Sequence, residues 1–259
     1  MRTKDFSTER QQTIIQHINS ESRVNVEDLA RLFNVTTATI RRDLIVLEKH
    51  GHLFRAHGGA VKREPVSVWQ MSSLQTRLAE HEAEKLRIAD YAASLISDGE
   101  SIMIDGGSTT TKTAYALKAK KNLLTVTNAL TIAEILSAAG KHKIILSGGE
   151  LLQETNALVG TAAEHSLECY RVDTAILGVS GLLPTAGAFS AIPQEAEIKR
   201  IMLANSARNI IVTDSSKIGV QAFYRFCEMT QIDVLITDTH INTTDLSFIR
   251  ELGCEVVAV

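Results

Sequence analysis

The stretch Asp105-Gly106-Gly107-Ser108-Thr109-Thr110 follows a short apolar run at residues 101–104 and precedes a helical pattern at residues 112–119. Two adjacent glycines let the backbone approach a bound molecule closely, and the three residues after them carry hydroxyl donors. Free N–H groups at a helix start add a partial positive charge. A strand, a glycine turn and a helix in this order favour an anion-binding loop. The same residues also suit an ordinary turn and helix cap, so the local pattern leaves both interpretations open.

Strand-like apolar runs recur on both sides of this loop, at intervals that leave room for crossover helices. The runs lie at residues 102–104, 123–127, 144–146, 174–179, 210–213, 234–237 and 256–259. Helical patterns lie between most of them, at residues 130–138, 162–169, 194–205 and 244–252, and a longer one at 73–96 precedes them. This alternation predicts an α/β domain with a mostly parallel sheet covered by helices.

Polar residues follow the ends of these expected strands, where ligands of open α/β sheets bind. Together they offer small residues, hydroxyls, carboxylates and one ammonium group, which suit a phosphorylated polyol. The candidate effector-binding residues are Asp105, Gly106, Gly107, Ser108, Thr109, Thr110, Thr127, Asn128, Gly148, Gly149, Asp214 and Lys217. The expected division of labour gives the phosphate to hydroxyls, amides and Lys217, and the sugar hydroxyls to the carboxylates.

The first 63 residues have the pattern of a small helical head. Apolar residues at helical spacing predict helices from about residue 8 to 20, from 26 to 33 and from 37 to 50. A short helix, a tight connection and a third helix capped by Thr36 form a helix-turn-helix pattern. The second helix of such a pair enters the major groove of DNA.

The third expected helix has two different faces. Its buried stripe is Ile40, Leu44 and Leu47. Arg41 and Arg42 lie off this stripe, and arginine offers a bidentate fork to guanine or phosphate. The alternative is a solvated face whose arginines pair only with nearby acids such as Asp43 and Glu48.

A basic β-hairpin is expected directly after the third helix. Residues 52–55 and 60–63 flank a turn at residues 56–59 that contains two glycines. Such a hairpin after a recognition helix is a wing, which can contact phosphates or the minor groove. Its basic side chains are Arg55, His57, Lys62 and Arg63.

The run Val35-Thr36-Thr37-Ala38-Thr39-Ile40-Arg41-Arg42-Asp43-Leu44, together with Arg55-Ala56-His57-Gly58-Gly59-Ala60, resembles the DeoR family of bacterial transcriptional regulators. The resemblance covers about 50 residues and implies a winged helix-turn-helix that binds operator DNA, usually as a repressor of sugar-use genes. The resemblance implies a structural role for Asp43. It implies contacts with DNA for Thr36, Thr37, Thr39, Arg41, Arg42, Arg55 and His57.

The remaining chain resembles the DeoR C-terminal sensor domain. The motifs that carry the resemblance are Asp105 to Thr110, Thr127-Asn128, Gly148-Gly149, Gly160, Gly178, Glu195-Ala196, Lys199 and Asp214-Ser215-Ser216-Lys217. It implies a fold similar to ribose-5-phosphate isomerases and a phosphorylated sugar as inducer, and it adds Glu195 and Lys199 to the effector set. The isomerases carry catalytic acids in a turn where residues 178–182 here have none, which favours sensing over turnover.

Composition sets limits on this interpretation. Of 259 residues, 44% are hydrophobic and 22% are charged, enough apolar side chains for packed domains. Residues 1–63 hold 11 basic and 7 acidic residues, a net charge of +4, whereas the remainder carries −7. Only the head is therefore expected to meet a polyanion such as double-stranded DNA. We expect a winged helix-turn-helix domain at 1–63, a linker at 64–78 and an α/β sensor domain at 79–259.

Several classes of protein are disfavoured. The N-terminus lacks the apolar core of a signal peptide, no apolar run approaches the length of a membrane span, and the three cysteines lack metal spacing. Neither a dinucleotide nor a P-loop fingerprint is present. We therefore expect a cytoplasmic, non-enzymatic homodimer or higher oligomer without metal or cofactor. The alternatives are a sugar-phosphate isomerase or transferase with a nucleic-acid-binding head, and a plain architectural DNA-binding protein.

Overall fold

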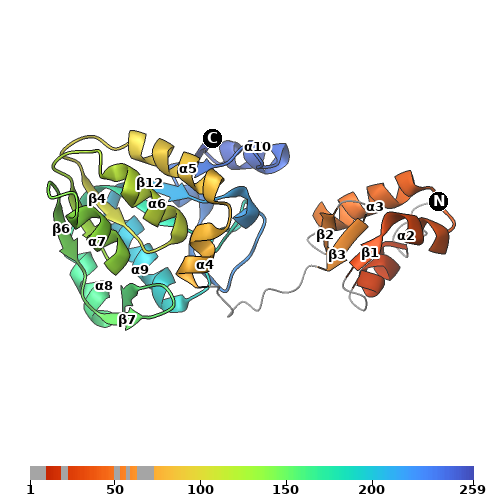
Figure 1. Cartoon of the computed structure of the whole chain (residues 1–259), viewed down its shortest axis with the longest axis horizontal. Helices are drawn as coiled ribbons and strands as arrows, with labels where there is room; N and C mark the ends of the chain where they lie inside the picture. The colour runs from red at the N-terminus through yellow and green to blue at the C-terminus, as the bar shows by residue number, and fades with distance from the viewer. Residues whose placement is uncertain (1–9, 19–22, 50–52, 57–58, 63–72) are drawn as a thin grey trace. The chain divides into compact units, whose positions relative to one another are not determined.

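The structure is a computed structural model, and it describes residues 10–18, 23–49, 53–56, 59–62 and 73–259. The chain divides into two compact units, residues 1–67 and residues 68–259. We call them the N-terminal unit and the C-terminal unit. Figure 1 draws the first in red and orange and the second from yellow to blue. Among the described residues, no helix combines the length and apolar character that a membrane crossing requires.

The N-terminal unit packs helices against a small antiparallel sheet. Residues 10–18 are helical. The elements that follow are β1 (Arg23–Asn25), α2 (Val26–Leu32), α3 (Thr37–Lys49), β2 (Leu53–Ala56) and β3 (Gly59–Lys62), with strand order β1-β3-β2. The expected stripe of Ile40, Leu44 and Leu47 is confirmed, since all three side chains are buried. They pack with Ile14 and Ile18 in one core.

Strand β1 was not expected from the sequence, which predicted only helices before the wing hairpin. The strand is only three residues long, and it pairs with the distant strand β3, Arg23 lying opposite Val61, 38 positions later in the chain. Gly59 allows the pairing, because a β-carbon there would lie 2.0 Å from the carbonyl oxygen of Val24. The wing hairpin is therefore joined to the helices by a third strand.

The C-terminal unit is built on a seven-stranded sheet of order β15-β14-β12-β9-β4-β5-β6. The strands are β4 (Ser101–Ile104), β5 (Leu124–Thr127), β6 (Lys143–Leu146), β9 (Val172–Gly178), β12 (Ser206–Val212), β14 (Val234–Thr237) and β15 (Glu255–Ala258). Every neighbouring pair is parallel, which confirms the predicted sheet. The chain order reverses between β4 and β9, so the crevice of the sheet opens there.

Helices cover both faces of this sheet (Figure 1). They are α5 (Glu82–Ser94), α6 (Ser108–Leu117), α7 (Leu130–Ser137), α8 (Thr161–Glu168), α9 (Pro193–Ala204) and α10 (Thr243–Glu251). Ile102 and Ile104 of β4 share a core with α5, α6 and α7, whereas Met103 packs with α8, α9 and α10 on the opposite face. This alternation follows from the two-residue period of a strand, and each fully buried aliphatic side chain contributes about 1.5–3 kcal/mol.

Short strands flank the main sheet and were not predicted. β7 (Glu150–Leu152) pairs with β8 (Ala157–Val159), while β10 (Gly181–Leu183), β11 (Gly187–Ser190) and β13 (Tyr224–Cys227) form a second small sheet. Two 3-10 turns, η1 (Ser215–Lys217) and η2 (Met229–Gln231), complete the elements. Three or four residues are too few to establish an alternating pattern in the sequence.

The first helical segment of the C-terminal unit differs from expectation. The long helix expected at 73–96 is two helices, α4 (Leu74–Ala79) and α5, separated at His81, whose backbone is left-handed with φ 49°. The ammonium of Lys85 donates hydrogen bonds to the carbonyl oxygens of Arg77 at 2.5 Å and Glu80 at 2.6 Å. These two carbonyl groups therefore need no backbone N–H partner within a helix. α4 also occupies residues that we assigned to the linker.

Candidate functional site

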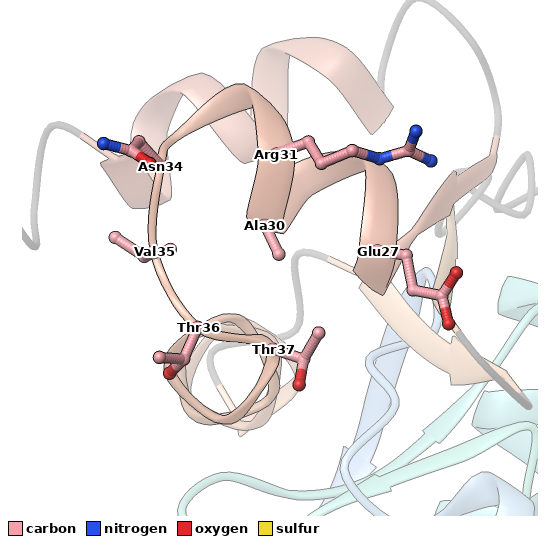
Figure 2. A pocket seen from close by; sticks show the side chains of 7 residues that line it. All are labelled: Glu27, Ala30, Arg31, Asn34, Val35, Thr36 and Thr37. Carbon is pink, nitrogen blue, oxygen red and sulfur yellow. The ribbon is translucent and has the colours of Figure 1, made fainter.

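The start of α3 carries the candidate DNA-facing threonines. Thr36 caps the helix as predicted, because its Oγ1 accepts a hydrogen bond from the backbone N–H of Thr39 at 3.2 Å and lies 3.0 Å from the Thr39 hydroxyl. Figure 2 shows Thr36 and Thr37 at the end of this helix, facing α2 across an open pocket. The pocket is lined by Glu27, Ala30, Arg31, Asn34, Val35, Thr36 and Thr37.

Arg41 and Arg42 are exposed, and neither has an ion pair within the part of the chain that the structure describes. Asp43 forms no ion pair with either arginine. It is 4% exposed and accepts hydrogen bonds from Arg10 Nε at 2.6 Å and Gln11 Nε2 at 3.0 Å. Asp43 therefore ties α3 to the first helix, as the structural role implied, and leaves both arginines available to an outside partner.

The two wing candidates are less completely placed. Arg55 lies in β2, which pairs with β3 in the predicted hairpin, and its side chain is outside what the structure describes. His57 lies outside the described residues. The backbone of the wing is thus established on both sides of its turn, whereas the contacts of its basic side chains stay predictions.

A buried ion pair lies at the crevice of the C-terminal sheet. Asp105, at the end of β4, pairs with Lys199 of α9, and the two side chains are 2% and 6% exposed. Asp105 Oδ1 also accepts from Gly178 N at 3.0 Å, and Lys199 donates to the Gly178 carbonyl at 3.0 Å. Burial lowers the pKa of the Lys199 ammonium to about 7, and the charge of Arg77 acts in the same direction. These two residues tie β4, β9 and α9 together beneath the crevice.

The loop beside this pair differs from the sequence expectation. α6 begins at Ser108, so Ser108, Thr109 and Thr110 are its first turn, and Gly107 is the N-cap without a side-chain hydrogen bond. The hydroxyl of Thr110 turns back to the Gly107 carbonyl at 3.2 Å, and is not the free ligand donor we expected. The first backbone bond of the helix comes from Thr111 to Gly107 at 2.9 Å. The three preceding N–H groups therefore have no acceptor within the helix.

Buried polar atoms without a partner lie close to this helix start. Glu195 is 5% exposed; its Oε2 lies 3.4 Å from the Ser190 hydroxyl, and the Thr155 hydroxyl is near enough to lower the pKa of this carboxyl, although neither Glu195 Oε1 nor Thr155 Oγ1 makes a hydrogen bond of ordinary geometry among the described residues. Asn128 Oδ1 has no hydrogen-bond partner among the described residues. A β-carbon on Gly106 would lie 3.9 Å from the Thr155 carbonyl, so Thr155 borders the loop. Buried atoms of this kind call for a ligand or water.

Burial raises the pKa of the Glu195 carboxyl, and the charge of Arg77 opposes that shift. Arg77 itself comes from α4, and burial lowers the pKa of its guanidinium while Glu195 and Glu80 raise it. Asp105, Glu195, Lys199 and Arg77 therefore form one electrostatically coupled group at the crevice. The sequence analysis identified Asp105 from its place at a strand end and Glu195 and Lys199 by resemblance, and it missed Arg77.

Other predicted residues have structural duties. The Thr127 hydroxyl donates to the Ile104 carbonyl at 2.7 Å and accepts from Ala129 N at 3.1 Å, so its bonding is complete. Gly149 has φ +114°, and a β-carbon there would lie 2.5 Å from the Val159 carbonyl. The fold itself therefore requires this glycine.

The outermost candidates are too far apart for one small ligand. Gly148 follows β6 at one edge of the sheet, and Lys217 lies in η1 after β12. Four strand spacings separate β6 from β12, about 19 Å in total, which exceeds the length of a monosaccharide phosphate. Asp214 is committed locally, since its carboxylate caps η1 by accepting from Ser216 N at 3.2 Å. The central group around α6 is therefore the compact site.

Two basic residues with buried atoms escaped the sequence analysis. Arg77, which is half-buried, lies within the helix expected at residues 73–96, and no sequence pattern marks it. Lys85 did leave a signal, because it precedes Ile88 by three residues and so falls on the apolar stripe of α5. A lysine that is only 2% exposed needs fixed partners, and the carbonyls of Arg77 and Glu80 supply them.

Comparison with known proteins matches both units. Residues 10–66 match the model of the DeoR-like helix-turn-helix domain, and residues 80–239 match that of the DeoR C terminal sensor domain. A glycerol-3-phosphate regulon repressor of Escherichia coli (strain K12) is 34% identical over 89% of this chain and 90% of its own. The HTH-type transcriptional repressor GlcR of Bacillus subtilis (strain 168) is 32% identical over 97% and 96%.

Among solved structures, a ribose 5-phosphate isomerase A from Methanocaldococcus jannaschii aligns with a TM-score of 0.41 at 17% identity, over 54% of this chain and 55% of that one. The stronger finding is the pair of family models, together with relatives that extend along nearly the whole chain. The chain belongs to the DeoR family of DNA-binding transcriptional regulators.

Proposed function

We propose that this regulator represses genes of carbohydrate metabolism and that a phosphorylated sugar relieves the repression. The observation that carries the proposal is the start of α6. The N–H groups of Ser108, Thr109 and Thr110 have no acceptor within the helix, and Asn128 nearby keeps a buried Oδ1 without a hydrogen-bond partner among the described residues. A helix N-terminus suits a phosphate, and carboxylate, hydroxyl and amide oxygens suit sugar hydroxyls.

The proposed division of roles follows from what each group already binds. The backbone N–H groups of Ser108, Thr109 and Thr110 receive the phosphate, and Glu195 and Asn128 receive hydroxyls. Asp105 and Lys199, which are bound to each other and to Gly178, position the loop from below. Thr127, Gly149 and Asp214 support the fold around the site, and Gly148 and Lys217, which follow strands four spacings apart, do not both contact one small ligand.

On the operator side, we propose that α3 enters the major groove. Thr37, Thr39, Arg41 and Arg42 would face the bases and phosphates, while Thr36 fixes the helix start. A helix-turn-helix protein binds two half-sites when it is a dimer, so we propose a homodimer or a larger oligomer of this chain. Because the proposed partner is chromosomal DNA, the proposed place of action is the cytoplasm.

Matched pairs of ligands test the proposal. Calorimetry should show that a sugar phosphate binds far more tightly than the free sugar, because the free sugar leaves the N–H donors of α6 without an acceptor. A gel shift with operator DNA should show release by the phosphate ester alone. Equal affinity for both members of every pair would mean that the start of α6 is only a helix terminus, and would refute the proposed ligand class.

A further inference from the structure

Two large aromatic side chains lie exposed next to each other on the C-terminal unit. Phe223 directly precedes β13 and is 48% exposed, and Tyr224, the first residue of that strand, is 45% exposed. At the other end of the strand, Phe226 and Cys227 are each only 3% exposed. Single apolar side chains are ordinary on a protein surface, whereas adjoining ones mark a contact with another molecule. Tyrosine and phenylalanine are also enriched in the buried centres of protein interfaces.

Strand β13 lies at an edge of its small sheet. The strand order is β10-β11-β13, so β11 covers one side of β13 and no strand of the described residues covers the other. Helix α9 packs against β13, and the Lys199 ammonium lies 5.8 Å from the centre of the Phe226 ring. The buried end of β13 is thus held by the interior of the C-terminal unit, whereas its aromatic end faces solvent.

A pair of opposite charges accompanies the aromatic residues. Arg225 follows Tyr224, and its Nη2 lies 3.7 Å from Glu228 Oε1, with side chains 51% and 62% exposed. Arg225 Nη1 also donates to the Ala186 carbonyl at 3.3 Å, which holds the guanidinium in place. An exposed ion pair of this kind contributes little within one chain, so either member can exchange its partner at small cost. We call Phe223, Tyr224, Arg225 and Glu228 the β13 patch.

The charges indicate which partner the β13 patch fits. Residues 64–259 carry a net charge of −7, so two copies of this unit repel each other wherever their negative surfaces meet. In the patch, Arg225 balances Glu228, and on the neighbouring helix α9 the exposed Arg200 balances Glu197. A neutral surface with both signs can match itself across a two-fold axis, where the same patch lies on both sides. Nucleic acid would instead require an excess of positive charge.

We propose that the β13 patch is the surface through which two copies of this chain associate. Phe223 and Tyr224 of both copies are buried at the centre of the contact, and Arg225 of one copy pairs with Glu228 of the other. The inference rests on the proposed function, in which the regulator acts as a homo-oligomer, and deepens it by assigning the surface that joins the copies.

Sedimentation velocity of the full-length protein, without DNA or effector, measures this contact. Wild type should be associated. Tyr224→Glu should raise the dissociation constant by about tenfold or more, because it removes a central ring and places a charge there. The matched control is Tyr115→Glu, the same change at a tyrosine of α6 that is 56% exposed, and it should associate like wild type. Circular dichroism shows whether each variant is folded.

Charge reversal gives a test that a change within one chain cannot imitate. Arg225→Glu places two negative charges in the β13 patch, and Glu228→Arg places two positive charges there. Each variant alone should dissociate to smaller species at concentrations where wild type is associated, because like charges face each other. An equimolar mixture of the two variants should associate again, since every glutamate then meets an arginine of the other variant.

The outcomes separate this inference from the proposed function. A monomeric wild type that still binds operator DNA and a sugar phosphate refutes the contact and leaves the sensor function intact. Wild-type association in Tyr224→Glu and in both charge variants refutes the β13 patch as the contact. Association that is lost in these variants and recovered in the mixture supports the patch, even in a chain that binds neither DNA nor a sugar phosphate and so contradicts the proposed function.

Discussion

Helices α3 and α6 begin with similar sequences and do different things with them. α3 starts in Thr36-Thr37-Ala38-Thr39, and α6 starts in Gly107-Ser108-Thr109-Thr110. In α3 the Thr36 hydroxyl caps the backbone, and side chains face outward. In α6 the N-cap is a glycine, and Thr110 and Thr111 turn their hydroxyls back to the Gly107 carbonyl. The first helix therefore offers side chains to a partner, whereas the second offers backbone N–H groups.

The surroundings of the two helix starts differ as strongly. Arg41 and Arg42 on α3 are exposed and can be replaced without disturbing a buried group. Behind α6, Asp105, Lys199 and Glu195 are all at most 5% exposed. A charged group that is buried away from water must keep its partner. Replacing a charged residue near α3 should therefore change only DNA binding, whereas replacing one behind α6 should change both folding and ligand binding.

The largest effect is expected from breaking the buried ion pair. Lys199→Met leaves the Asp105 carboxylate without its partner and should destabilise the C-terminal unit by about 3–5 kcal/mol. Urea denaturation monitored by circular dichroism measures the loss. The double variant Asp105→Asn/Lys199→Met should recover part of it, because no uncompensated charge remains. A stability like that of wild type in Lys199→Met would show that this pair does not support the crevice.

At α3 the effect should fall on DNA binding alone. Arg41→Ala or Arg42→Ala should weaken operator binding by about 1–3 kcal/mol for a lost base contact, and a lost phosphate contact should also flatten the salt dependence. Gel-shift titration at several salt concentrations is the measurement. Arg31→Ala is the control, since Arg31 is exposed but already paired with Asp28 at 2.6 Å. Unchanged affinity in both test variants would remove α3 from the interface.

Removing the cap distinguishes the two helix starts directly. Thr36→Ala should cost about 1 kcal/mol of stability in the N-terminal unit, the usual loss for a missing side-chain cap. Thr110→Val should cost less at α6, because its hydroxyl bonds to a carbonyl that Thr111 also serves at 2.6 Å. Thermal denaturation of both variants gives the comparison. An equal loss in both would mean that α6 is capped as fully as α3.

A smaller effect is expected from Glu195, since the Thr155 hydroxyl and then the charge of Arg77 oppose the rise in pKa that burial causes. Burial raises the folded-state pKa of the Glu195 carboxyl above its ordinary value of 4.5. The folded protein then binds more protons than the unfolded chain in that window, so this group costs stability as the pH rises through it. Glu195→Gln should remove the cost and raise the melting temperature more at pH 8 than at pH 4. The reverse ordering would contradict a raised pKa.

The sequence predicted the framework well because its signals are local. The seven strands of the main sheet are continuous apolar runs, and the Ile40, Leu44 and Leu47 stripe repeats at helical spacing. The break at His81 was missed because the stripe of α5 gives no sign of it. The partnership of Asp105 with Lys199 joins residues 94 positions apart, and the approach of Arg77 to Glu195 depends on how α4 packs. Spacing carries no information about such contacts.

The smallest change in stability should come from Gly107→Ala, and it tests the comparison most closely. A side chain at this position requires no forbidden backbone angles, because Gly107 has φ −158° and ψ 168°, an extended conformation open to any residue. A β-carbon would meet only Thr110 Oγ1, at 3.1 Å. We therefore expect stability to change by about 0.5 kcal/mol or less.

The response to ligand should nevertheless be lost, because the added methyl group stands where a phosphate would approach the N–H groups of α6. Operator binding without ligand should equal that of wild type, which makes Gly107→Ala a repressor that cannot be induced. The corresponding change at α3, Ala38→Gly, alters no N–H site and should leave the ligand response intact. Calorimetry with a sugar phosphate and gel shift with operator DNA measure the two properties separately. Normal induction of Gly107→Ala would show that the ligand does not use the start of α6, and the difference between the two helices would then have no bearing on sensing.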